Sequence, residues 1–356
     1  MKTKKMLINT RQNDEIRVAL MEGKRLLDLD IELSHRKQKK ANIYKAKISR
    51  IEPSLNAVFV DYGMEKHGFL PIKEIAPQYL PNHVKNLSDI ALKDIFKEGQ
   101  DILIQVEKEE RGNKGAAIST YISLAGCYLV IMPNNPKAGG ISRKIEGDAR
   151  QELKNMMKNL NIPDNMGAIL RTACLDRSQE ELQWDIDALC KLWQAIDDAY
   201  QTREAPCLIY QESDVVFRSI RDYLRQEITE IIVDTEHTYN RVIDLIKKLR
   251  PNFVDRVKLH ESETPLFSRY NIEDQIETTH IREITLPSGA SIVIDPAEAL
   301  TAIDVNSAKA TKGGNIEETA LNINLEAAEE IARQLRLRDL GGLIVIDFID
   351  MSSHQD

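Results

Sequence analysis

Two stretches near the C-terminal end decide the fold: Ala302-Ile303-Asp304-Val305-Asn306-Ser307, and later Gly342-Leu343-Ile344-Val345-Ile346-Asp347-Phe348-Ile349-Asp350. Each is an apolar run that carries carboxylates at its end, a pattern typical of a buried strand. A carboxylate at the edge of a core loses solvation, and a divalent cation with oxygen ligands compensates for that loss. The pattern therefore predicts a cation site between the strand ends, although two unrelated aspartates that cap the following turns explain it equally well.

The segment between these stretches predicts a helix over 316–339, with Gly313-Gly314 before it and Gly341-Gly342 after it. A strand, a helix and a strand in this order form a crossover, so Asp304 and Asp347 are expected at the ends of neighbouring parallel strands. Asn306, two residues after Asp304, would face the same way on a strand. The apolar face of the helix is predicted to consist of Leu321, Leu325, Ala328, Ile331, Ala332 and Leu335. Two lysines in the connecting loop are either phosphate contacts or ordinary loop residues: Lys309 and Lys312.

The composition is that of a globular chain without membrane segments. It has 356 residues, 42% hydrophobic and 29% charged, and a length that suggests roughly two to three domains. We expect neither a signal peptide nor a membrane helix, because the apolar runs are too short. The four cysteines are scattered, which favours a cytoplasmic protein without a zinc site. With 48 basic and 56 acidic residues the net charge is -8, so a nucleic acid would need a local basic patch.

Residues 41–117 predict a small β-barrel, with strand-like runs at 43–48, 56–61, 68–70 and 101–106 separated by turn residues. Phe59 and Phe69 fall on successive strands, where two rings stack the bases of a single strand or, equally, belong to the core. The basic residues around this module favour the first interpretation: Arg36, Lys37, Lys39, Lys40, Lys45, Lys47, Arg50, Lys108, Arg111 and Lys114.

Residues 123–213 predict a second unit with a helix over 179–200. Arg171 offers a planar fork and Thr172 a hydroxyl, so the pair could hold a terminal phosphate, as could Gly139-Gly140 with Arg143 and Lys144. An Arg-Thr pair at a strand end is more often a surface feature. The stretch 214–279 predicts further helices, including one over 219–230, and a strand at 231–233. P-loop, nucleophile-elbow and H-E-x-x-H motifs are absent from the sequence, which disfavours those chemistries.

The chain resembles the ribonuclease E/G family. The likeness is carried by the two aspartate stretches and by these further motifs: Met6–Asn9, Lys39–Lys45, Ile51–Leu55, Phe59–Gly63, His67–Pro71, Ile122–Gly126 and Gly139–Arg143. It implies a mixed α/β fold of several subdomains. An RNase H-like lobe would comprise 1–37 and 217–279, interrupted by an OB-fold RNA-binding domain over 38–120 and a 5′-sensor subdomain over 121–216. A deoxyribonuclease-like α/β catalytic lobe over 280–356 would follow and be incomplete.

The same resemblance implies a magnesium-dependent endoribonuclease that cleaves single-stranded RNA and leaves a 5′-phosphate and a 3′-hydroxyl, in mRNA decay and in rRNA and tRNA processing. A 5′-monophosphate would stimulate it. Asp304 and Asp347 would hold the magnesium, with Asn306 supporting Asp304 and the part of Asp350 left open. RNA would be bound by Phe59, Phe69 and Lys114, and the 5′ end by Arg171, Thr172, Gly126 and Val130.

In that family the chain continues into a C-P-x-C zinc link and a small dimerisation domain. Cys207 is the last cysteine of this sequence, so the zinc ligands are absent from it, and the activity and oligomeric state of such a truncated chain stay open. The resemblance implies single-stranded RNA rather than DNA as the partner. It also implies a homo-oligomer and a cytoplasmic or membrane-associated location for the full-length protein. RNA preference, degradosome partners and the choice between the two branches of the family remain open. The alternative is a non-catalytic RNA-binding module, which has no need of Asp304 and Asp347.

Overall fold

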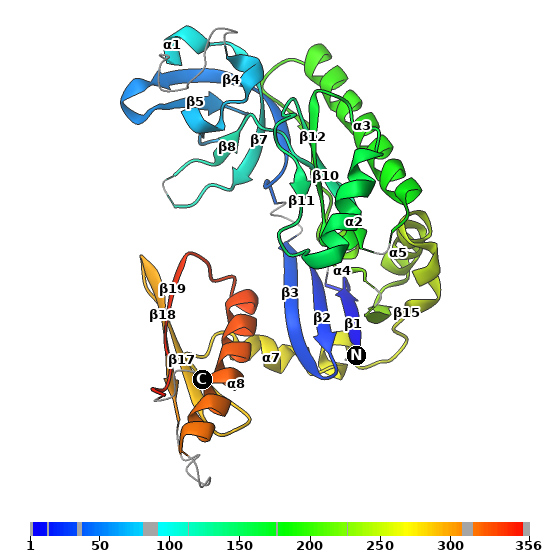
Figure 1. Ribbon diagram of the computed structural model, residues 1–356, viewed down its shortest axis with the longest axis vertical. Helices are drawn as coiled ribbons and strands as arrows, with labels where there is room; N and C mark the ends of the chain where they lie inside the picture. Colours follow the sequence, from blue (N-terminus) through cyan, green and yellow to red (C-terminus); the bar gives the residue numbers. More distant parts are fainter. Residues whose placement is uncertain are drawn as a thin grey trace. The chain divides into compact units, whose positions relative to one another are not determined.

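A computed structural model describes residues 3–12, 14–33, 38–80, 92–112, 114–175, 177–225, 227–307 and 316–351. The chain divides into two compact units, Arg36–Tyr223 and the combination of Met1–His35 with Leu224–Asp356 (Figure 1). Each unit contains two sheets, so the predicted mixed α/β fold is confirmed. Arg36 and Lys37, and the loop with Lys309 and Lys312, lie outside the described residues.

The first sheet of unit 36–223 is a closed barrel, as predicted. Its strands follow the order β4-β5-β6-β8-β7, and pairing between β4 and β7 closes the ring. Apolar side chains of alternating strand positions fill the interior, including Ile48, Val58 and Ile104. A further strand, β13 (Cys207–Tyr210), pairs with β4 on the outside of the ring. The barrel strands are β4 (Ile43–Glu52), β5 (Ala57–Asp61), β6 (Gly68–Pro71), β7 (Asp101–Lys108) and β8 (Ala117–Ser119).

The second sheet of this unit has the order β11-β12-β10-β9. The long helix α3 (Gln179–Thr202) packs along it, which confirms the predicted helix (Figure 1). A capping box of Ser178 and Glu181 fixes the start of α3 by satisfying its free amide groups. The remaining elements are β9 (Leu124–Ala125), β10 (Leu129–Pro133), β11 (Gly140–Ile141), β12 (Met166–Leu170), α1 (Leu92–Ile95), α2 (Gly147–Lys158) and α4 (Val215–Tyr223).

The first sheet of the other unit follows the order β15-β14-β1-β2-β3, in which β1 runs parallel to β14 and antiparallel to β2. The helix predicted over 219–230 is wrong in its second half. Helix α4 ends at Tyr223, and Ile228 starts strand β14, because the β-branched run that follows suits a central strand. The elements are β1 (Lys4–Asn9), β2 (Glu15–Glu22), β3 (Arg25–Leu33), β14 (Ile228–Val233), β15 (Val257–Leu259), α5 (Glu236–Leu249), α6 (Leu266–Arg269) and α7 (Ile272–Thr278).

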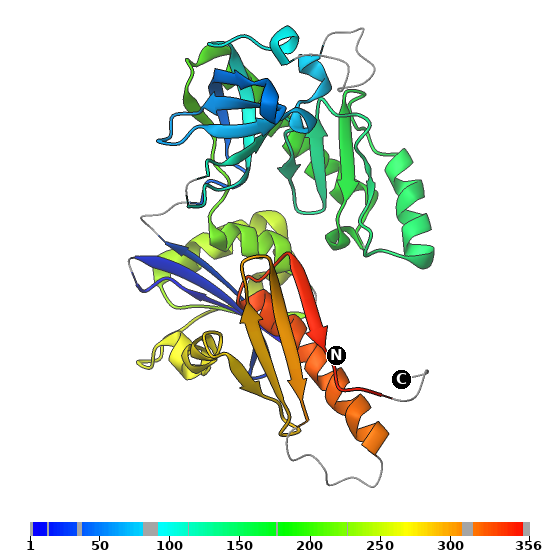
Figure 2. The same ribbon diagram turned by 90° about the vertical axis from the view of Figure 1, so that its left-hand side faces the viewer.

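The second sheet of this unit contains both aspartate stretches. Its order is β16-β17-β18-β19, and β18 and β19 are parallel, so the predicted strand-helix-strand crossover is confirmed. Helix α8 lies along one face of this sheet (Figure 2), and apolar residues from both form a core around Ile292, Ile303 and Ile323. The elements are β16 (Glu283–Thr285), β17 (Ser291–Pro296), β18 (Leu300–Asn306), α8 (Ile316–Leu337) and β19 (Leu343–Asp347).

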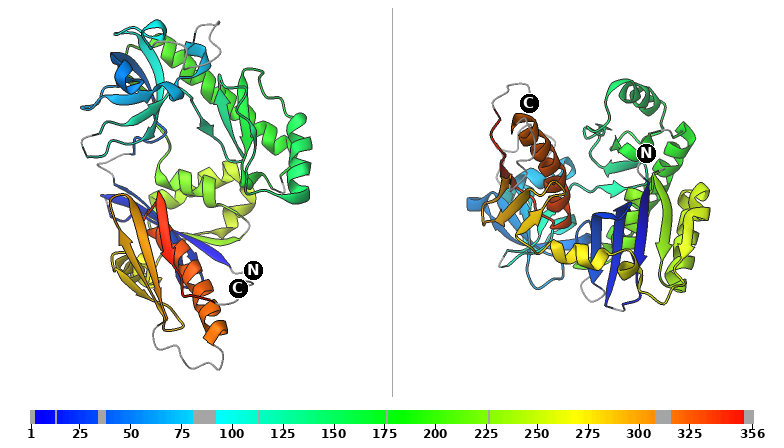
Figure 3. Two further views of the ribbon diagram at one scale, coloured as in Figure 1. Left: turned by 60° about the vertical axis from the view of Figure 1, so that its left-hand side comes forward. Right: turned by 90° about the horizontal axis from the view of Figure 1, so that it is seen from below.

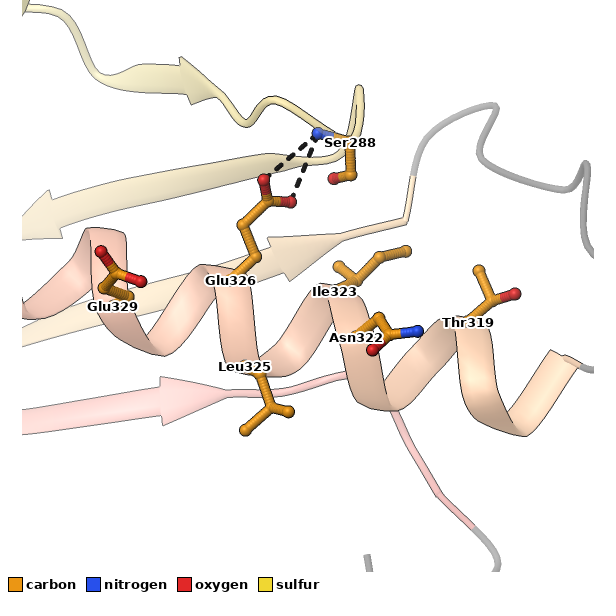
Figure 4. A pocket seen from close by; sticks show the side chains of 7 residues that line it. All are labelled: Ser288, Thr319, Asn322, Ile323, Leu325, Glu326 and Glu329. Carbon is orange, nitrogen blue, oxygen red and sulfur yellow. Dashed lines mark hydrogen bonds between the residues drawn. The ribbon is translucent and has the colours of Figure 1, made fainter.

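The predicted apolar face of α8 is partly wrong. Leu325 is 61% exposed, whereas Ile323 and Ala327 are buried against the sheet. Figure 4 shows Leu325 on the opposite side of the helix from Glu326, whose carboxylate accepts hydrogen bonds from the Ser288 amide at 3.3 Å. The buried face of α8 differs from the predicted one because it also includes three polar residues, which an apolar pattern cannot detect: Asn324, Glu330 and Gln334. Within the described part of the chain, every helix is too short or too polar to cross a membrane.

Candidate functional site

Asp304 and Asp347 lie side by side on adjacent strands. They are register partners in the parallel β18–β19 ladder, where neighbouring strands run about 4.8 Å apart. Figure 3 shows β19 next to β18 at the edge of the sheet. Asn306, two positions along β18, donates through Nδ2 to Oδ2 of Asp304 at 2.9 Å. The topology thus brings two carboxylates and one amide to one end of two strands.

The expectation that these strands are buried is wrong. Burial alternates along β18, so that Ile303 and Val305 face α8 while Asp304 and Asn306 are exposed. Along β19 every residue is exposed or half-buried, and Leu343 is 60% exposed. The reason is the two-residue period of a strand on a sheet that α8 covers on one face. Both carboxylates therefore keep their access to water, so a loss of solvation is not the reason for a cation at this position.

The donor set fits a hard divalent cation. Carboxylate oxygens are the ligands that Mg²⁺ prefers, and this ion keeps several waters, so one or two carboxylates suffice to bind it. Among the described residues there is no group of three or more His, Cys, Asp or Glu side chains placed to hold a metal. A cation here would take its protein ligands from Asp304 and Asp347. Asp350 follows β19, directly after Ile349, whose backbone amide and carbonyl both bond the Asn324 side chain at 3.0 and 2.9 Å.

The barrel carries a pair of half-buried aromatic rings on its surface. Phe59 and Phe69 are register partners on β5 and β6, and their ring centroids lie 5.9 Å apart at an interplanar angle of 65°. The guanidinium carbon of exposed Arg50 lies 4.7 Å from the centroid of the Phe59 ring. Lys114 is exposed in the loop that leads into β8. These residues combine apolar ring surface with positive charge, the composition of a platform for single-stranded nucleic acid.

The basic rim predicted around the barrel is only partly available. Lys45 is buried, and its Nζ donates to the carbonyl oxygens of Tyr200 and Arg203 at 2.8 Å each. Lys47 pairs with Asp101 at 2.8 Å, and these lysines lower the pKa of that carboxyl. Lys45 is therefore unavailable to the rim, because it is buried and tied to the end of α3. The Lys47 side chain is 43% exposed beside its ion pair, so its place in the rim stays a prediction. Lys39 also has a carboxylate partner, Glu110.

Arg171 is attached to the turn at 126–129 by main-chain and side-chain contacts. Its amide donates to the Tyr128 carbonyl at 2.8 Å, and its Nη1 donates to the Gly126 carbonyl at 2.7 Å. Val130, the next residue on β10 after Leu129, pairs with Ala125 and Ile169 in the same sheet. The structure thus brings Gly126 into contact with Arg171 and places Val130 in the same sheet, while Thr172 is the residue that follows Arg171 in the chain. The alternative phosphate candidate lies on the neighbouring strand, where Gly140 pairs with Ile169.

A second guanidinium and a carboxylate complete the surroundings of Arg171. Its Nη2 forms an ion pair with Asp222, which also pairs with Arg221 at 3.1 Å. Burial raises the pKa of the Asp222 carboxyl, but Arg221 and Arg171 lower it by more, so the pKa lies below its usual range. Arg171 is therefore held by a carbonyl on one side and an ionised carboxylate on the other.

Asp185 is the residue of this region that the sequence argument did not single out. It is 4% exposed, and its carboxylate accepts from the amides of Cys127, Tyr128 and Leu129 at 3.1, 2.8 and 3.2 Å. Burial raises the pKa of this carboxyl, against the lowering effect of the three amides and Arg171. A signal was present in the sequence: Asp185 falls within the apolar stripe of α3, and a buried carboxylate requires hydrogen-bond donors.

Comparison with known proteins defines the class to which this fold and site belong. The pattern of the Ribonuclease E/G family matches residues 123–356, and the pattern of the S1 RNA binding domain matches residues 37–121. The chain is a member of the ribonuclease E/G family, and its barrel is an S1 domain.

Individual relatives place the chain within that family. It is 62% identical over 349 residues to Ribonuclease E of Haemophilus influenzae, covering 98% of this chain and 37% of that protein. It is 61% identical over 350 residues to Ribonuclease E of Escherichia coli, covering 98% of this chain and 33% of that protein. Identity to Ribonuclease G of Haemophilus influenzae is lower, 34% over 355 residues, with 98% and 72% covered. The chain thus spans about a third of the length of these ribonuclease E relatives.

Proposed function

We propose that this chain is the RNA-binding and cleaving part of a metal-dependent endoribonuclease that acts on single-stranded RNA. The observation that carries the proposal is the register pairing of Asp304 and Asp347 on two parallel strands, on the face of the sheet that α8 leaves open. The family membership supports the reaction class, and the S1 barrel supports RNA as the substrate.

Asp304 and Asp347 would hold a magnesium ion, and Asn306 would fix the orientation of the Asp304 carboxylate through its hydrogen bond of 2.9 Å. When bound, such an ion lowers the pKa of a coordinated water and neutralises charge on a phosphodiester. The protein would contribute the exposed carboxylate pair and the RNA-binding surfaces described next. Attack of water on phosphorus with departure of the 3′ oxygen would leave a 5′-phosphate and a 3′-hydroxyl.

Two other surfaces would bind the RNA. Phe59, Phe69 and Lys114 on the barrel would stack bases and contact a phosphate. Arg171 and Thr172, with Gly126 and Val130 beside them, would bind a 5′-monophosphate. This would favour substrates that carry one, because an arginine fork pairs with phosphate by charge-assisted hydrogen bonds.

The finer assignments suggested by the resemblance stand as part of the same proposal. They include the RNase H-like lobe (1–37 and 217–279), the OB-fold (38–120), the 5′-sensor (121–216) and the deoxyribonuclease-like lobe (280–356). They also include roles in mRNA decay and in rRNA and tRNA processing, assembly of the full-length protein into a homo-oligomer with zinc, and a cytoplasmic location. The sheet order β15-β14-β1-β2-β3 supports the RNase H-like assignment. In it β1, β2 and β3 pair antiparallel, and β14 and β15 run parallel to β1.

The decisive test is cleavage of a short 5′-monophosphorylated single strand in magnesium. Asp304→Asn and Asp347→Asn are each expected to abolish cleavage while RNA affinity stays within a few-fold of the parent, because the barrel is untouched. Asp295→Asn is the matched control: Asp295 lies on the adjacent strand β17 of the same sheet and pairs with Arg282, so this variant should cleave like the parent. A parent-like rate in either Asp304→Asn or Asp347→Asn would refute the metal assignment. A parent that binds RNA without cleaving it would favour a non-catalytic RNA-binding module.

A further inference from the structure

The turn at 126–129 has its polar groups divided between two partners. The Gly126 amide donates to the Leu129 carbonyl at 2.8 Å, which closes the turn between β9 and β10. The next three amides, those of residues 127–129, donate to the buried carboxylate of Asp185. The carbonyls of Gly126 and Tyr128 instead accept from Arg171. One side of the turn is therefore anchored to α3, and the other side holds the arginine.

The fold itself requires a glycine at position 126, whether or not a ligand is bound. A Cβ built on Gly126 would lie 2.5 and 2.7 Å from the two carboxylate oxygens of Asp185. Asp185 cannot move aside at low cost, because it is buried and its two oxygens satisfy three amides. The absence of a side chain at Gly126 thus allows the carboxylate to sit directly under the turn.

This turn holds the Arg171 guanidinium on one side, and Asp222 holds it on the other. Its Nη1 is fixed by the Gly126 carbonyl at 2.7 Å, and that peptide is part of the turn that Asp185 anchors. A planar guanidinium binds a phosphate through two parallel N–H groups, so a small rotation of the fork removes one of the two bonds. Whatever loosens the turn is expected to misalign Arg171 without touching a ligand.

We propose that Asp185 is a positioning residue for recognition of the 5′-phosphate: from beneath the 126–129 turn it fixes the Gly126 carbonyl that orients Arg171. This inference rests on the proposed 5′-sensing role of Arg171. Asp185 is buried beneath the turn, so it would act without touching the RNA. It also gives Gly126 a second function, that of admitting the Asp185 carboxylate.

The test compares kcat and KM for two RNAs of one sequence, one with a 5′-monophosphate and one with a 5′-hydroxyl. In Asp185→Ala we expect KM for the monophosphorylated RNA to rise until the two RNAs are cleaved with equal kcat/KM, as in Arg171→Ala. Asp187→Ala, two residues further along α3, is the matched control, because Asp187 is exposed and accepts a hydrogen bond from Gln183 of the same helix at 2.9 Å. This control should keep the preference of the parent.

Two further variants separate positioning from folding. Asp185→Asn keeps one oxygen but turns its own NH₂ group toward a backbone N–H, and Gly126→Ala displaces the carboxylate. Both variants should lose part or all of the preference for the 5′-monophosphate. A melting temperature for each variant shows whether it is folded. If Asp185→Ala or the folded Asp185→Asn kept the preference while Arg171→Ala lost it, the inference would be overturned and the sensor retained. A fall in kcat/KM by the same factor on both RNAs would likewise overturn it, as a general structural role. A parent without any preference would overturn the proposed sensor itself, and the inference with it.

Discussion

The sharpest prediction for RNA binding concerns the ring of Phe59. The ring is half-buried, meets Phe69 edge-on with centroids 5.9 Å apart, and has the Arg50 guanidinium carbon 4.7 Å from its centroid. Phe59→Ala removes a stacking surface and leaves both neighbours without their contact. The interior of the barrel is formed by other positions of the same strand, Val58 and Val60, which stay in place.

The size of each effect follows from these contacts. A base stacked on an aromatic ring contributes about 1 to 3 kcal/mol, so the dissociation constant for single-stranded RNA should rise roughly 5- to 150-fold. Loss of the ring pair costs the fold about 0.5 to 1.5 kcal/mol, and loss of the Arg50 contact about 0.5 to 1 kcal/mol. The variant should therefore remain folded while its affinity falls.

The assay is a fluorescence titration of a short RNA at several salt concentrations, with thermal unfolding recorded in parallel. Phe59→Tyr keeps an aromatic face and should bind like the parent, whereas Phe59→Leu keeps apolar volume and should bind as weakly as Phe59→Ala. The slope of affinity against salt should not change, because the ring contacts no phosphate. Parent-like affinity in a folded Phe59→Ala protein would refute the reasoning and return the ring to a structural role.

Two further predictions concern a phosphate contact of the barrel and a buried carboxylate of α8. Lys114→Ala should reduce the slope of log K against log salt by about 0.7, the contribution of one phosphate contact on a single strand; an unchanged slope in the same titration would exclude that contact. Burial raises the pKa of Glu330, but hydrogen bonds from Arg333, Gln334 and Arg25 lower it by more, so its folded pKa lies below that of an ordinary glutamate. Its stabilising contribution is thus complete above the unfolded pKa of about 4.3 and disappears as the pH falls through the folded value. Glu330→Gln should lower the free energy of unfolding, measured in urea, by about 3 kcal/mol at pH 7 and by clearly less near pH 3. An equal loss at both pH values would show that the ionised form of Glu330 is not what stabilises the fold.

The parts of the fold that follow a simple period were predictable. The barrel strands alternate apolar and polar residues between turn residues, and the observed β4 to β7 overlap the predicted runs. The strand-helix-strand order fixed the neighbourhood of Asp304 and Asp347, which the register of β18 and β19 confirms. These features are local in sequence, or depend on a connection rule that holds for nearly all parallel strands.

The parts that were missed depend on partners distant in sequence. Glu330 is buried on α8 because Arg25 of β3 and Arg333 satisfy its carboxylate, and a hydrophobic pattern assigns such a residue to the surface. The exposure of Leu343 follows from which face of the sheet α8 covers, a choice that the composition of β19 does not encode. The bonds of Lys45 to the carbonyls of Tyr200 and Arg203 are likewise invisible to a count of basic residues.

The carboxylates of this chain differ in the capacity that their contacts leave for a ligand. Asp185 satisfies three amides and is buried, and Asp222 is held between Arg171 and Arg221, so the oxygens of both are committed to the protein. Asp304 is exposed, accepts from Asn306, and stands beside the exposed Asp347. Two like charges on adjacent strands repel each other unless a cation lies between them. Of these three sites, the Asp304–Asp347 pair has the least compensation from the protein, which supports the proposed cation site. The compensated carboxylates instead hold arginines and a turn in place.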